Sequence, residues 1–513
     1  MVTELALSRR GKVALSRSNS VGWNRANPRE ELRVHVNMDG QGPLHAQLTR
    51  ALKVALFAGR LGGAGRLPAT RQLARELGLS RNTVLAAYEQ LRAEGFVRGR
   101  VGSGSFITPP VRPEVPATTP QAERPPQSAF ARRGRRYHDH ATMAGRPTPG
   151  MRYAFSYGVP YTNPALTSAW ARELARAAAY TAPNYPMTQG LPALRDAVCD
   201  YLARRRGVQV LPEDVLIVAG TQQAMALSAR VLLDVGESAV VEEPHYTAMR
   251  EVLQMHGAQV DAVDVDAQGL RLDRLPSPAP KLVCVTPSHQ FPSGVVMSLE
   301  RRLALLDYAR RHDCWIFEDD YDGEFRYDAQ PLAALRSLDR DGRVVYVGTF
   351  SKVLFPSLRL GYLVMPPGLR RDYLNAKWQD DFGSSAIEQA ALANFMADGG
   401  FERHLRRTAR ALAERRSALM DGLARELGDA LHIADSRAGM HLVAWLRKAD
   451  QAQGHALILA AHEKGLDLYP IAPYYQRAPA QAGLLMGFAS MSVAEIEQAV
   501  QVFAACMRGQ GLA

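Results

Sequence analysis

Near the start of the chain, apolar residues recur at the spacing of amphipathic helices. Helical periodicity covers 44–56 and, in a shorter segment, 71–77, with Thr70 as the expected N-cap of the second helix. A third helix is expected after Ser80, a further N-cap residue, and a glycine in the intervening turn allows the chain to reverse. Two short helices joined in this way predict a helix-turn-helix.

A short alternating segment follows the third helix. Residues 96–107 alternate apolar and polar positions around several glycines, which predicts a β-hairpin. A hairpin directly after a helix-turn-helix forms a wing, so we expect a winged helix-turn-helix DNA-binding domain over residues 35–108. Residues 1–34 show no clear periodicity and predict a flexible N-terminal arm.

The rest of the chain has a different pattern. Residues 109–150 contain nine prolines and seven arginines, which predicts an extended linker. Residues 151–513 alternate helical stretches with strand-like apolar runs, at 215–219, 238–241, 282–285, 315–317 and 344–347. That alternation predicts an α/β fold with a mainly parallel sheet flanked by helices, which binds ligands at the carboxyl ends of its strands. From about residue 401 onward we expect a smaller C-terminal α+β lobe.

The charges are unevenly distributed between these parts. Residues 1–150 hold 24 Lys and Arg against 10 Asp and Glu, whereas residues 151–513 hold 38 against 41. A basic N-terminal part beside a nearly neutral remainder predicts a polyanionic partner, and double-stranded DNA is the polyanion that a winged helix binds. A solvated basic tail is the alternative, which we prefer for the first 30 residues.

Other features narrow the class of protein. The basic N-terminus lacks the apolar core of a secretory signal, and no apolar run approaches the roughly 18 residues that span a bilayer. The four cysteines are scattered, without the spacing of a metal site or a redox pair. We therefore expect a cytoplasmic protein with no bound metal and no membrane association.

The start of the third helix carries the expected DNA contacts, because the second helix of a helix-turn-helix inserts its first residues into the major groove. An arginine there suits guanine, an asparagine suits adenine, and hydroxyls suit phosphate. With the start of the preceding helix and the tip of the wing, the expected DNA-binding residues are Arg71, Ser80, Arg81, Asn82, Thr83 and Gly102. The alternative is a small helical domain whose arginines are only solvated.

This segment resembles the winged-helix domain of the GntR superfamily of bacterial regulators. The resemblance covers residues 43–107 and rests on three motifs, RLPATR (66–71), LGLSRNTV (77–84) and GSGSF (102–106). It implies sequence-specific binding to duplex DNA.

One lysine stands just after a β-branched strand, in the segment TFSKVLFPSLRLG (349–361). A lysine at a strand end in a dry cleft has a lowered pKa and forms Schiff bases. Arg359, seven residues after Lys352, suits a phosphate, and pyridoxal phosphate carries both an aldehyde and a phosphate. A solvated lysine in a basic turn is the alternative.

Further polar groups follow other strands. Asp319, Asp320 and Tyr321 come after the run at 315–317, and a buried carboxylate there would keep a pyridine nitrogen protonated. An acidic surface loop and a divalent metal site are the alternatives.

Two more strand ends offer binding groups. Gly220, Thr221 and Gln222 lead into a helix whose first backbone N–H groups form an anion site. Tyr246 offers a ring to stack on a cofactor, although a buried core tyrosine is the ordinary alternative.

Together these residues resemble the fold-type I aminotransferases, and their combination with a GntR-like winged helix is similar to the MocR subfamily of transcriptional regulators. The most specific segments are TPSHQFPSG (286–294), EDDYDGEFRY (318–327) and the segment around Lys352. The resemblance implies pyridoxal 5′-phosphate bound as a Schiff base to Lys352 of a homodimer. It places Asp319, with Asp320 in reserve, at the pyridine nitrogen, Tyr321 at the ring hydroxyl and Tyr246 on the ring. The phosphate would be held by Gly220, Thr221, Gln222, Ser351 and Arg359.

Two residues depart from the aminotransferase pattern. Phe291 replaces the asparagine that usually precedes Pro-Thr-Gly, so His289 or Gln290 would have to take its place. Leu485 replaces an arginine that binds the substrate carboxylate in many relatives. The leucine removes one half of a bidentate carboxylate clamp, which argues against efficient transamination of ordinary amino acids.

Three functions are compatible with these residues. The leading hypothesis is a transcriptional regulator that senses pyridoxal phosphate, or an amine or amino acid that condenses with it. As a homodimer it would bind an operator with repeated half-sites. The second is a functional aminotransferase with an accessory DNA-binding domain. The third is a DNA-binding protein whose large domain is only a dimerisation scaffold.

Overall fold

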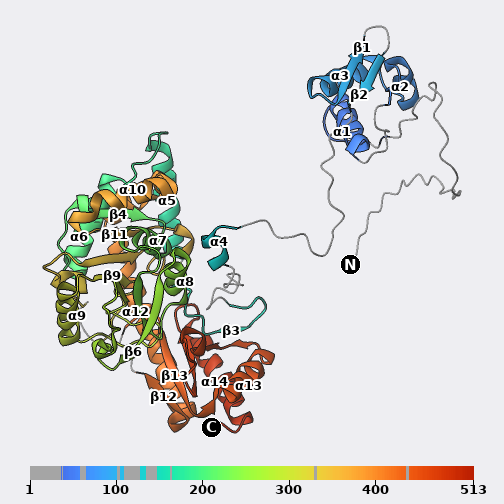
Figure 1. Cartoon of the computed structure of the whole chain (residues 1–513). Helices are drawn as coiled ribbons and strands as arrows, with labels where there is room; N and C mark the ends of the chain where they lie inside the picture. Colours follow the sequence, from blue (N-terminus) through green and yellow to red (C-terminus); the bar gives the residue numbers. More distant parts are fainter. Residues whose placement is uncertain are drawn as a thin grey trace. The chain divides into compact units, whose positions relative to one another are not determined.

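The computed structural model describes residues 36, 38–57, 65–100, 104–108, 127–134, 147–161, 164–327, 332–434 and 438–513. The chain divides into two compact units, residues 1–125 and 126–513 (Figure 1). The expected N-terminal arm and most of the expected linker lie outside the described residues. No helix in the described ranges combines the length and the apolarity needed to cross a membrane.

The N-terminal unit has the predicted winged-helix architecture. Its elements are α1 (Leu44–Phe57), α2 (Thr70–Leu77), α3 (Arg81–Ala93), β1 (Val97–Arg100) and β2 (Gly104–Ile107). The two strands pair antiparallel, from Val97 opposite Ile107 to Arg100 opposite Gly104. Buried apolar side chains from all three helices and both strands form a single core cluster. This core fixes the direction in which the start of α3 projects.

The ends of α2 and α3 test the predictions of their N-cap residues. Ser80 is confirmed as the N-cap of α3, since its Oγ accepts a hydrogen bond from the Thr83 N–H at 3.1 Å. The N-cap prediction for Thr70 is wrong. Helix α2 begins at Thr70 itself, because the carbonyl of Ala69 already accepts the first helical hydrogen bonds. Gly78 ends α2 in the left-handed conformation, with φ 66°.

The large unit is built on an eight-stranded sheet. In spatial order its strands are β4 (Val215–Val218), β11 (Gly361–Val364), β10 (Val344–Thr349), β9 (Trp315–Asp320), β8 (Leu282–Val285), β5 (Ser238–Glu243), β6 (Gln259–Asp266) and β7 (Gly269–Leu270). Neighbours from β10 to β6 run parallel, whereas β11 and β7 run antiparallel to their neighbours. All five predicted runs are strands, and the sheet is mainly parallel as predicted.

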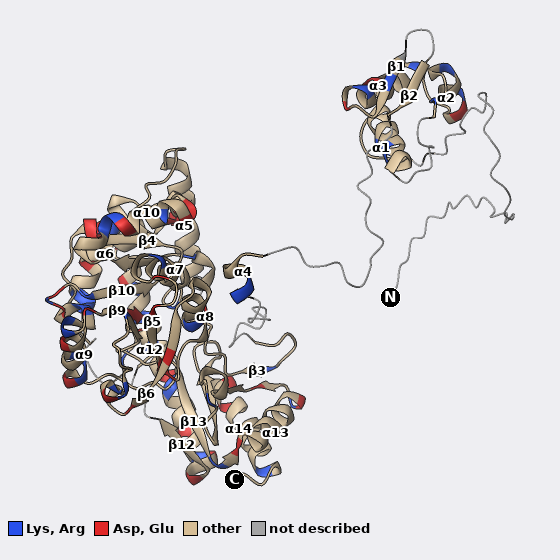
Figure 2. Cartoon of the chain, viewed as in Figure 1, with Lys and Arg blue, Asp and Glu red and all other residues tan. Residues whose placement is uncertain are grey.

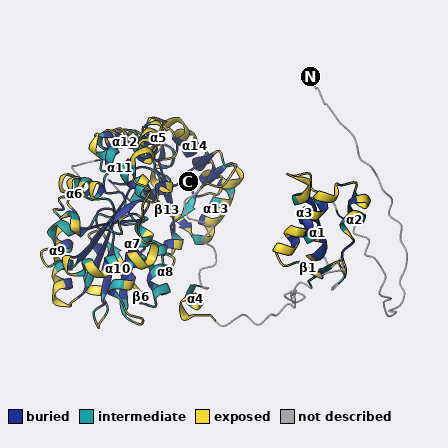
Figure 3. Ribbon diagram, turned by 90° about the horizontal axis from the view of Figure 1, so that it is seen from above, coloured by how far each residue is buried: buried dark blue, intermediate teal, exposed yellow. Residues whose placement is uncertain are grey.

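Helices cover both faces of this sheet (Figure 1). They are α5 (Pro164–Tyr180), α6 (Pro192–Arg206), α7 (Thr221–Leu232), α8 (Thr247–His256), α9 (Leu299–Arg311), α10 (Arg370–Asp381) and α11 (Ala386–Ala397). Alternate strand residues enter different core clusters: Phe317 of β9 packs on the side of α7, α8 and α10, and Ile316 packs on the side of α9. Figure 3 shows the strands buried between helices whose outer faces are exposed.

The predicted C-terminal α+β lobe is present. Helix α12 (Gly400–Leu427) leads into β12 (Leu431–Ala434), β13 (His441–Asp450), α13 (Gln451–Glu463), β14 (Leu466–Asp467), β15 (Tyr469–Pro470), β16 (Gln481–Gly487) and α14 (Val493–Gly509). Four of these strands form a sheet in the order β12-β13-β16-β15, and β14 pairs with β3 (Tyr153–Ala154).

Part of the expected linker is folded. Residues of α4 (Ala129–Gly134) pack against α8: Arg133 Nε donates to the carbonyl of Met255 at 2.8 Å, and the Phe130 and His256 rings lie 5.7 Å apart. The prediction of an extended linker over all of 109–150 is therefore wrong at this helix. Phe130 and Arg133 make these contacts, which the average composition of the segment does not reveal.

Candidate functional site

The residues predicted at separate strand ends meet at one edge of the large sheet. Thr349 at the end of β10 lies opposite Gly361 of β11, which lies opposite Val218 at the end of β4. On the other side of β10, Val347 lies opposite Asp319 of β9. The turns that follow β4, β9 and β10 therefore converge, as expected at the carboxyl edge of parallel strands.

Lys352 lies in the turn after β10 and is only partly accessible. Its Nζ donates a hydrogen bond to the carbonyl of Gly158 at 3.1 Å. Burial lowers the pKa of the Lys352 amine, against the opposing effect of the carboxylates of Asp322 and Asp319. A desolvated amine with a lowered pKa is a nucleophile for carbonyl groups.

Asp319 lies close to Lys352 and has an unsatisfied acceptor. Its side chain is buried, and among the described residues its Oδ1 has no hydrogen-bond partner. Burial raises the pKa of Asp319 to about 8, and the neighbouring carboxylate of Asp320 adds to this rise. A buried acceptor without a donor is costly, so this oxygen calls for a donor that the chain itself does not supply.

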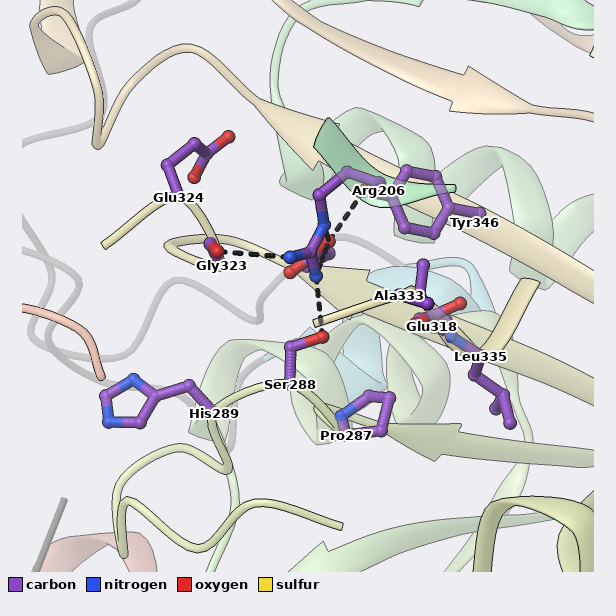
Figure 4. A network of polar contacts seen from close by, with 12 residues as sticks. Arg206, Pro287, Ser288, His289, Glu318, Gly323, Glu324, Ala333, Leu335 and Tyr346 are labelled. Atoms are coloured by element: carbon purple, nitrogen blue, oxygen red, sulfur yellow. Dashed lines mark hydrogen bonds and ion pairs between the residues drawn. The ribbon is translucent and has the colours of Figure 1, made fainter. Parts of the chain in front are cut away.

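Asp320 follows Asp319 in β9 and therefore lies on the opposite face of the strand, where it pairs with Arg206. Figure 4 shows the polar network around Arg206. The Oδ2 of Asp320 accepts hydrogen bonds from Arg206 Nε and from the Tyr346 hydroxyl, both at 2.6 Å. Arg206 also donates to the carbonyl of Gly323 at 3.0 Å and to Ser288 Oγ at 2.7 Å. Asp320 thus neutralises a guanidinium that is 1% exposed.

Two phenols lie near Asp319. Tyr246 occupies the N-cap position of α8, and Tyr321 follows β9 with its hydroxyl 2.9 Å from His289 Nδ1. Burial raises the pKa of both phenols. The Phe291 ring stands perpendicular to both, at 6.0 Å from Tyr246 and 5.9 Å from Tyr321. Phe291, which replaces the usual asparagine, therefore places an apolar ring beside both phenols.

The two expected substitutes for that asparagine differ. Gln290 is bound by its own neighbourhood, because its Nε2 donates to the carbonyl of Pro244 at 2.7 Å and to Glu242 Oε2 at 3.2 Å. The Gln290 amide group thus already donates to groups of the chain. His289 lies next to Tyr321 and stays a candidate.

The predicted anion site has a helix start beside a guanidinium. Gly220 adopts φ 83° as the N-cap of α7, and Thr221 is the first residue of that helix. Arg359 Nη2 donates to the carbonyl of Ala219 at 2.5 Å, and a Cβ atom on Gly220 would lie 3.4 Å from Arg359 Nη1. The structure thus brings Arg359 to the helix start, where backbone N–H groups favour an anion.

The other two predicted phosphate-binding residues are Ser351 and Gln222. Ser351 is partly buried after β10, and its N–H donates to Thr349 Oγ1 at 3.1 Å. Gln222 is exposed on the first turn of α7.

Leu485 lies in β16 and is fully buried. It packs with Tyr157, Val443, Ile471 and Tyr474 in an apolar and aromatic cluster. A leucine in this cluster offers no hydrogen-bond donor to a carboxylate.

The predicted DNA-binding residues lie on the surface of the winged helix. Arg71, Ser80, Arg81 and Asn82 are exposed, and Thr83 is half-buried. Basic residues mark α2 and α3 in Figure 2. Gly102 lies outside the described residues. The start of α3 therefore presents side chains to a partner without any loss of core packing.

Comparisons with known proteins agree with this two-part architecture. Residues 44–107 match the family model for bacterial regulatory proteins of the gntR family, and residues 156–503 match that for class I and II aminotransferases. The chain is 38% identical to the probable rhizopine catabolism regulatory protein MocR of Rhizobium meliloti over 89% of this chain and 92% of the relative. The chain is a MocR-type regulator of the GntR family.

Further relatives extend the likeness of this MocR-type regulator. It is 31% identical to the pyridoxine biosynthesis transcriptional regulator PdxR of Corynebacterium glutamicum, over 92% of this chain and 99% of PdxR. Its fold is similar to that of the Pyrococcus horikoshii kynurenine aminotransferase solved in complex with PMP. The TM-score is 0.64 at 26% identity, over 73% of this chain and 98% of that enzyme.

Sequence reasoning missed several buried polar groups of this MocR-type chain. Arg206 is buried beside Asp320, Glu318 is buried within β9, and Glu242 is buried near the end of β5. Asp322 and His441 lie close to Lys352. Burial raises the pKa of Glu242 to about 7 and lowers that of His441 to about 3. The available signal was a charged residue at the end of an apolar run, as Glu242 is in β5.

Proposed function

We propose that this MocR-type regulator binds pyridoxal 5′-phosphate in its large unit and that the cofactor, or an amine or amino acid that condenses with it, controls operator binding. The pair formed by Asp319 and Lys352 carries the proposal. In the described part of the chain, Asp319 has a buried oxygen without a donor, and the Lys352 amine is desolvated. A protonated pyridine ring that bears an aldehyde satisfies both groups.

Each predicted cofactor residue then has a role. Bound pyridoxal phosphate supplies an aldehyde that condenses with amines and a ring that withdraws electrons. Lys352 attaches the cofactor, Asp319 keeps the ring nitrogen protonated, Tyr321 contacts the ring hydroxyl and Tyr246 stacks on the ring. The phosphate is held by Gly220, Thr221, Gln222, Ser351 and Arg359.

The names of two relatives bear on the effector. PdxR is named for pyridoxine biosynthesis, and MocR is named for rhizopine catabolism. One relative is thus named after cofactor supply and the other after the breakdown of a small molecule. The apolar surroundings of Leu485 favour pyridoxal phosphate itself, or an amine that is not held through a carboxylate–arginine pair.

On the DNA side, Arg81 and Asn82 read base edges, and Arg71, Ser80, Thr83 and Gly102 contact the backbone. An exposed apolar cluster supports the homodimer: Tyr185, Met187, Trp378 and Phe382 are 82%, 53%, 48% and 43% exposed. The Phe382 ring lies 5.4 Å from that of Tyr185 and 5.2 Å from that of Trp378. Monomers seldom expose such a cluster, and a two-fold dimer calls for repeated half-sites in the operator. The domain boundaries at 35–108 and 151–513 and the cytoplasmic location stay predictions.

The second function is a working aminotransferase with an accessory DNA-binding domain, which the match to the aminotransferase family favours. Turnover of an amino donor and a 2-oxo acid at an ordinary enzymatic rate would decide for it.

The decisive experiment compares absorbance and DNA binding for wild type, Lys352→Ala and the control Lys281→Ala. Lys281 is a surface lysine paired with Asp313 at 3.3 Å. We expect the long-wavelength band of protein-bound pyridoxal phosphate in wild type and control and not in Lys352→Ala, with operator affinity that responds to the cofactor only where the band forms. A band that persists in Lys352→Ala contradicts the attachment site. Unchanged operator affinity in the presence of the band contradicts the sensing role.

A further inference from the structure

The large unit carries a row of exposed arginines on α12. Arg403, Arg406, Arg407 and Arg410 are exposed and spaced so that they share one face of the helix. Residues 403–413 contain these four arginines and no acidic residue. We call the four side chains the α12 arginine row.

The row is held in place and is not neutralised. Leu405, Thr408 and Leu412 bury the opposite face of α12, which fixes the outward direction of the row. Within the described ranges no ion pair involves Arg406, Arg407 or Arg410. Three exposed arginines elsewhere in this unit, Arg274, Arg310 and Arg311, are instead each paired with an aspartate.

We infer that the α12 arginine row binds the phosphate backbone of DNA, in addition to the contacts made by the winged helix. Its charge is exceptional in a unit that holds 38 basic against 41 acidic residues from 151 onward. Guanidinium groups match phosphate with two parallel hydrogen bonds. From Arg403 to Arg410 the row extends over about 10 Å of helix, and a duplex presents about one charge per 1.7 Å of its axis.

The test is the salt dependence of DNA binding by the full chain. The variant is Arg406→Gln, Arg407→Gln and Arg410→Gln together, the control is the same change at the paired Arg274, Arg310 and Arg311, and the probe is a fluorescent duplex of about 50 base pairs of mixed sequence. We expect the log–log salt slope to fall by about 2–3 and affinity to drop at least tenfold in the variant, because each lost phosphate contact removes about 0.9 from the slope.

Three lysines at the same positions are expected to restore most of the slope. A slope equal to that of wild type in the glutamine variant, or an equal loss in the control, overturns the inference. The same comparison in an Arg81→Ala background separates this surface from the winged helix, because the loss should persist there.

A second inference rests on a buried cluster behind Tyr321 and on the proposed contact of Tyr321 with the cofactor. His289 Nδ1 lies 2.9 Å from the Tyr321 hydroxyl oxygen and 3.1 and 2.9 Å from the two oxygens of Asp322. The side chains of His289 and Asp322 are 1% and 2% exposed. The two rings of His289 and His441 lie 5.0 Å apart.

The proton on His289 follows from these contacts. A carboxylate only accepts hydrogen bonds, so Nδ1 carries the proton that it shares with Asp322. The same N–H then faces the phenol oxygen of Tyr321, which must accept. The hydroxyl hydrogen of Tyr321 is thereby free to point into the cleft that holds Lys352.

We propose that His289, held by Asp322, is a positioning residue that directs the Tyr321 hydroxyl to the ring oxygen of bound pyridoxal phosphate. His289, Asp322 and His441 also have potential ligand atoms within 4.8 Å of one another. The 2.9 Å separations are hydrogen-bond lengths, shorter than the roughly 3.3 Å between two ligand atoms of a tetrahedral Zn²⁺ ion.

A double-mutant cycle tests this positioning. We expect Tyr321→Phe and His289→Leu each to weaken pyridoxal phosphate binding about tenfold and to shift the absorbance maximum of the bound cofactor, and the double variant to be no worse than either single variant. Asp322→Asn should give the same shift in smaller amount.

Additive losses, an unshifted maximum in His289→Leu, or a maximum that EDTA moves in the wild type overturn the inference. If wild type shows no cofactor band at all, the proposed function itself fails, so the two failures are distinct.

Discussion

The two folded units hold their functional residues in opposite ways. In the winged helix, Arg71, Arg81 and Asn82 are exposed on a small apolar core that does not depend on them. In the large unit, Asp319 is buried and Lys352 largely so, at strand ends where further buried charges surround them.

Because of this difference, substitutions of exposed residues should change binding with little effect on stability, whereas substitutions of buried charges should change stability. An exposed arginine can be replaced at little cost to the fold, because water already solvates both states. A buried charge is stable only with its partners, so a change at one residue of the large unit acts on its neighbours. The predictions that follow test this contrast, beginning with the largest effect.

Arg206→Met should have the largest effect on folding. It leaves the buried carboxylate of Asp320 without its guanidinium, which lies within 2.6 Å, and we expect a loss of about 3–5 kcal/mol in the free energy of unfolding. Urea denaturation measures this loss. The matched control is Arg310→Ala, whose exposed pair with Asp307 should contribute less than about 1 kcal/mol. Equal losses for the two variants would remove the contrast between buried and exposed charges.

Arg81→Ala should affect binding alone. We expect operator affinity to fall by about 1–3 kcal/mol, with an unchanged melting temperature, because the exposed guanidinium touches no core residue. Fluorescence anisotropy with the operator measures the affinity. Arg92→Ala, at the far end of α3, serves as the control and should have a smaller effect. A large drop in melting temperature for Arg81→Ala would contradict the separation.

Asp319→Asn should change how stability depends on pH in the cofactor-free protein. Burial raises the pKa of Asp319 to about 8, above the roughly 3.9 of an unfolded chain, so between these values the folded state binds more protons than the unfolded state. The free energy of unfolding therefore falls as pH rises through this window. Removing the group should flatten the slope by up to about 1.4 kcal/mol per pH unit.

Urea titrations between pH 5 and pH 8 measure that slope, a window of about three units. Burial also raises the pKa values of Glu242, Glu318 and Glu324 to about 7, so part of the slope should persist below that pH. Asp307→Asn, on the surface, should leave the slope unchanged. The same slope in Asp319→Asn as in wild type would show that Asp319 is ionised in the fold.

Ser80→Ala should have the smallest effect on stability. It removes the hydroxyl that accepts from the Thr83 N–H, and we expect the winged helix to lose about 1 kcal/mol. Ser80→Asn restores a capping acceptor and should recover that stability in thermal melts. If Ser80 also contacts DNA, operator affinity should stay reduced in the asparagine variant.

Much of this comparison was accessible from the sequence, because it depends on local patterns. Periodicity, caps and alternation predicted the helices, the wing and five strands of the large sheet, and strand ends located Lys352 and Asp319. The missed features depend on distant partners. Strand β11 is four residues long and is a strand because β10 and β4 pair with it on either side. Helix α4 is held by α8, more than a hundred residues later.

By itself, the sequence determined that a basic winged helix precedes an α/β domain and that a lysine, an acid and a phenol follow its strands. Only the tertiary structure decided which acid faces the cleft. Side chains alternate between the two faces of a strand, so Asp319 and Asp320 lie on opposite faces of β9. The alternation does not tell which of the two lies on the face of Lys352. Arg206, at the end of α6, pairs with Asp320 on one face of β9. Asp319 lies on the other face, beside Lys352, and has an oxygen without a hydrogen-bond partner among the described residues. Such a choice depends on contacts between residues far apart in the chain, which no local pattern contains.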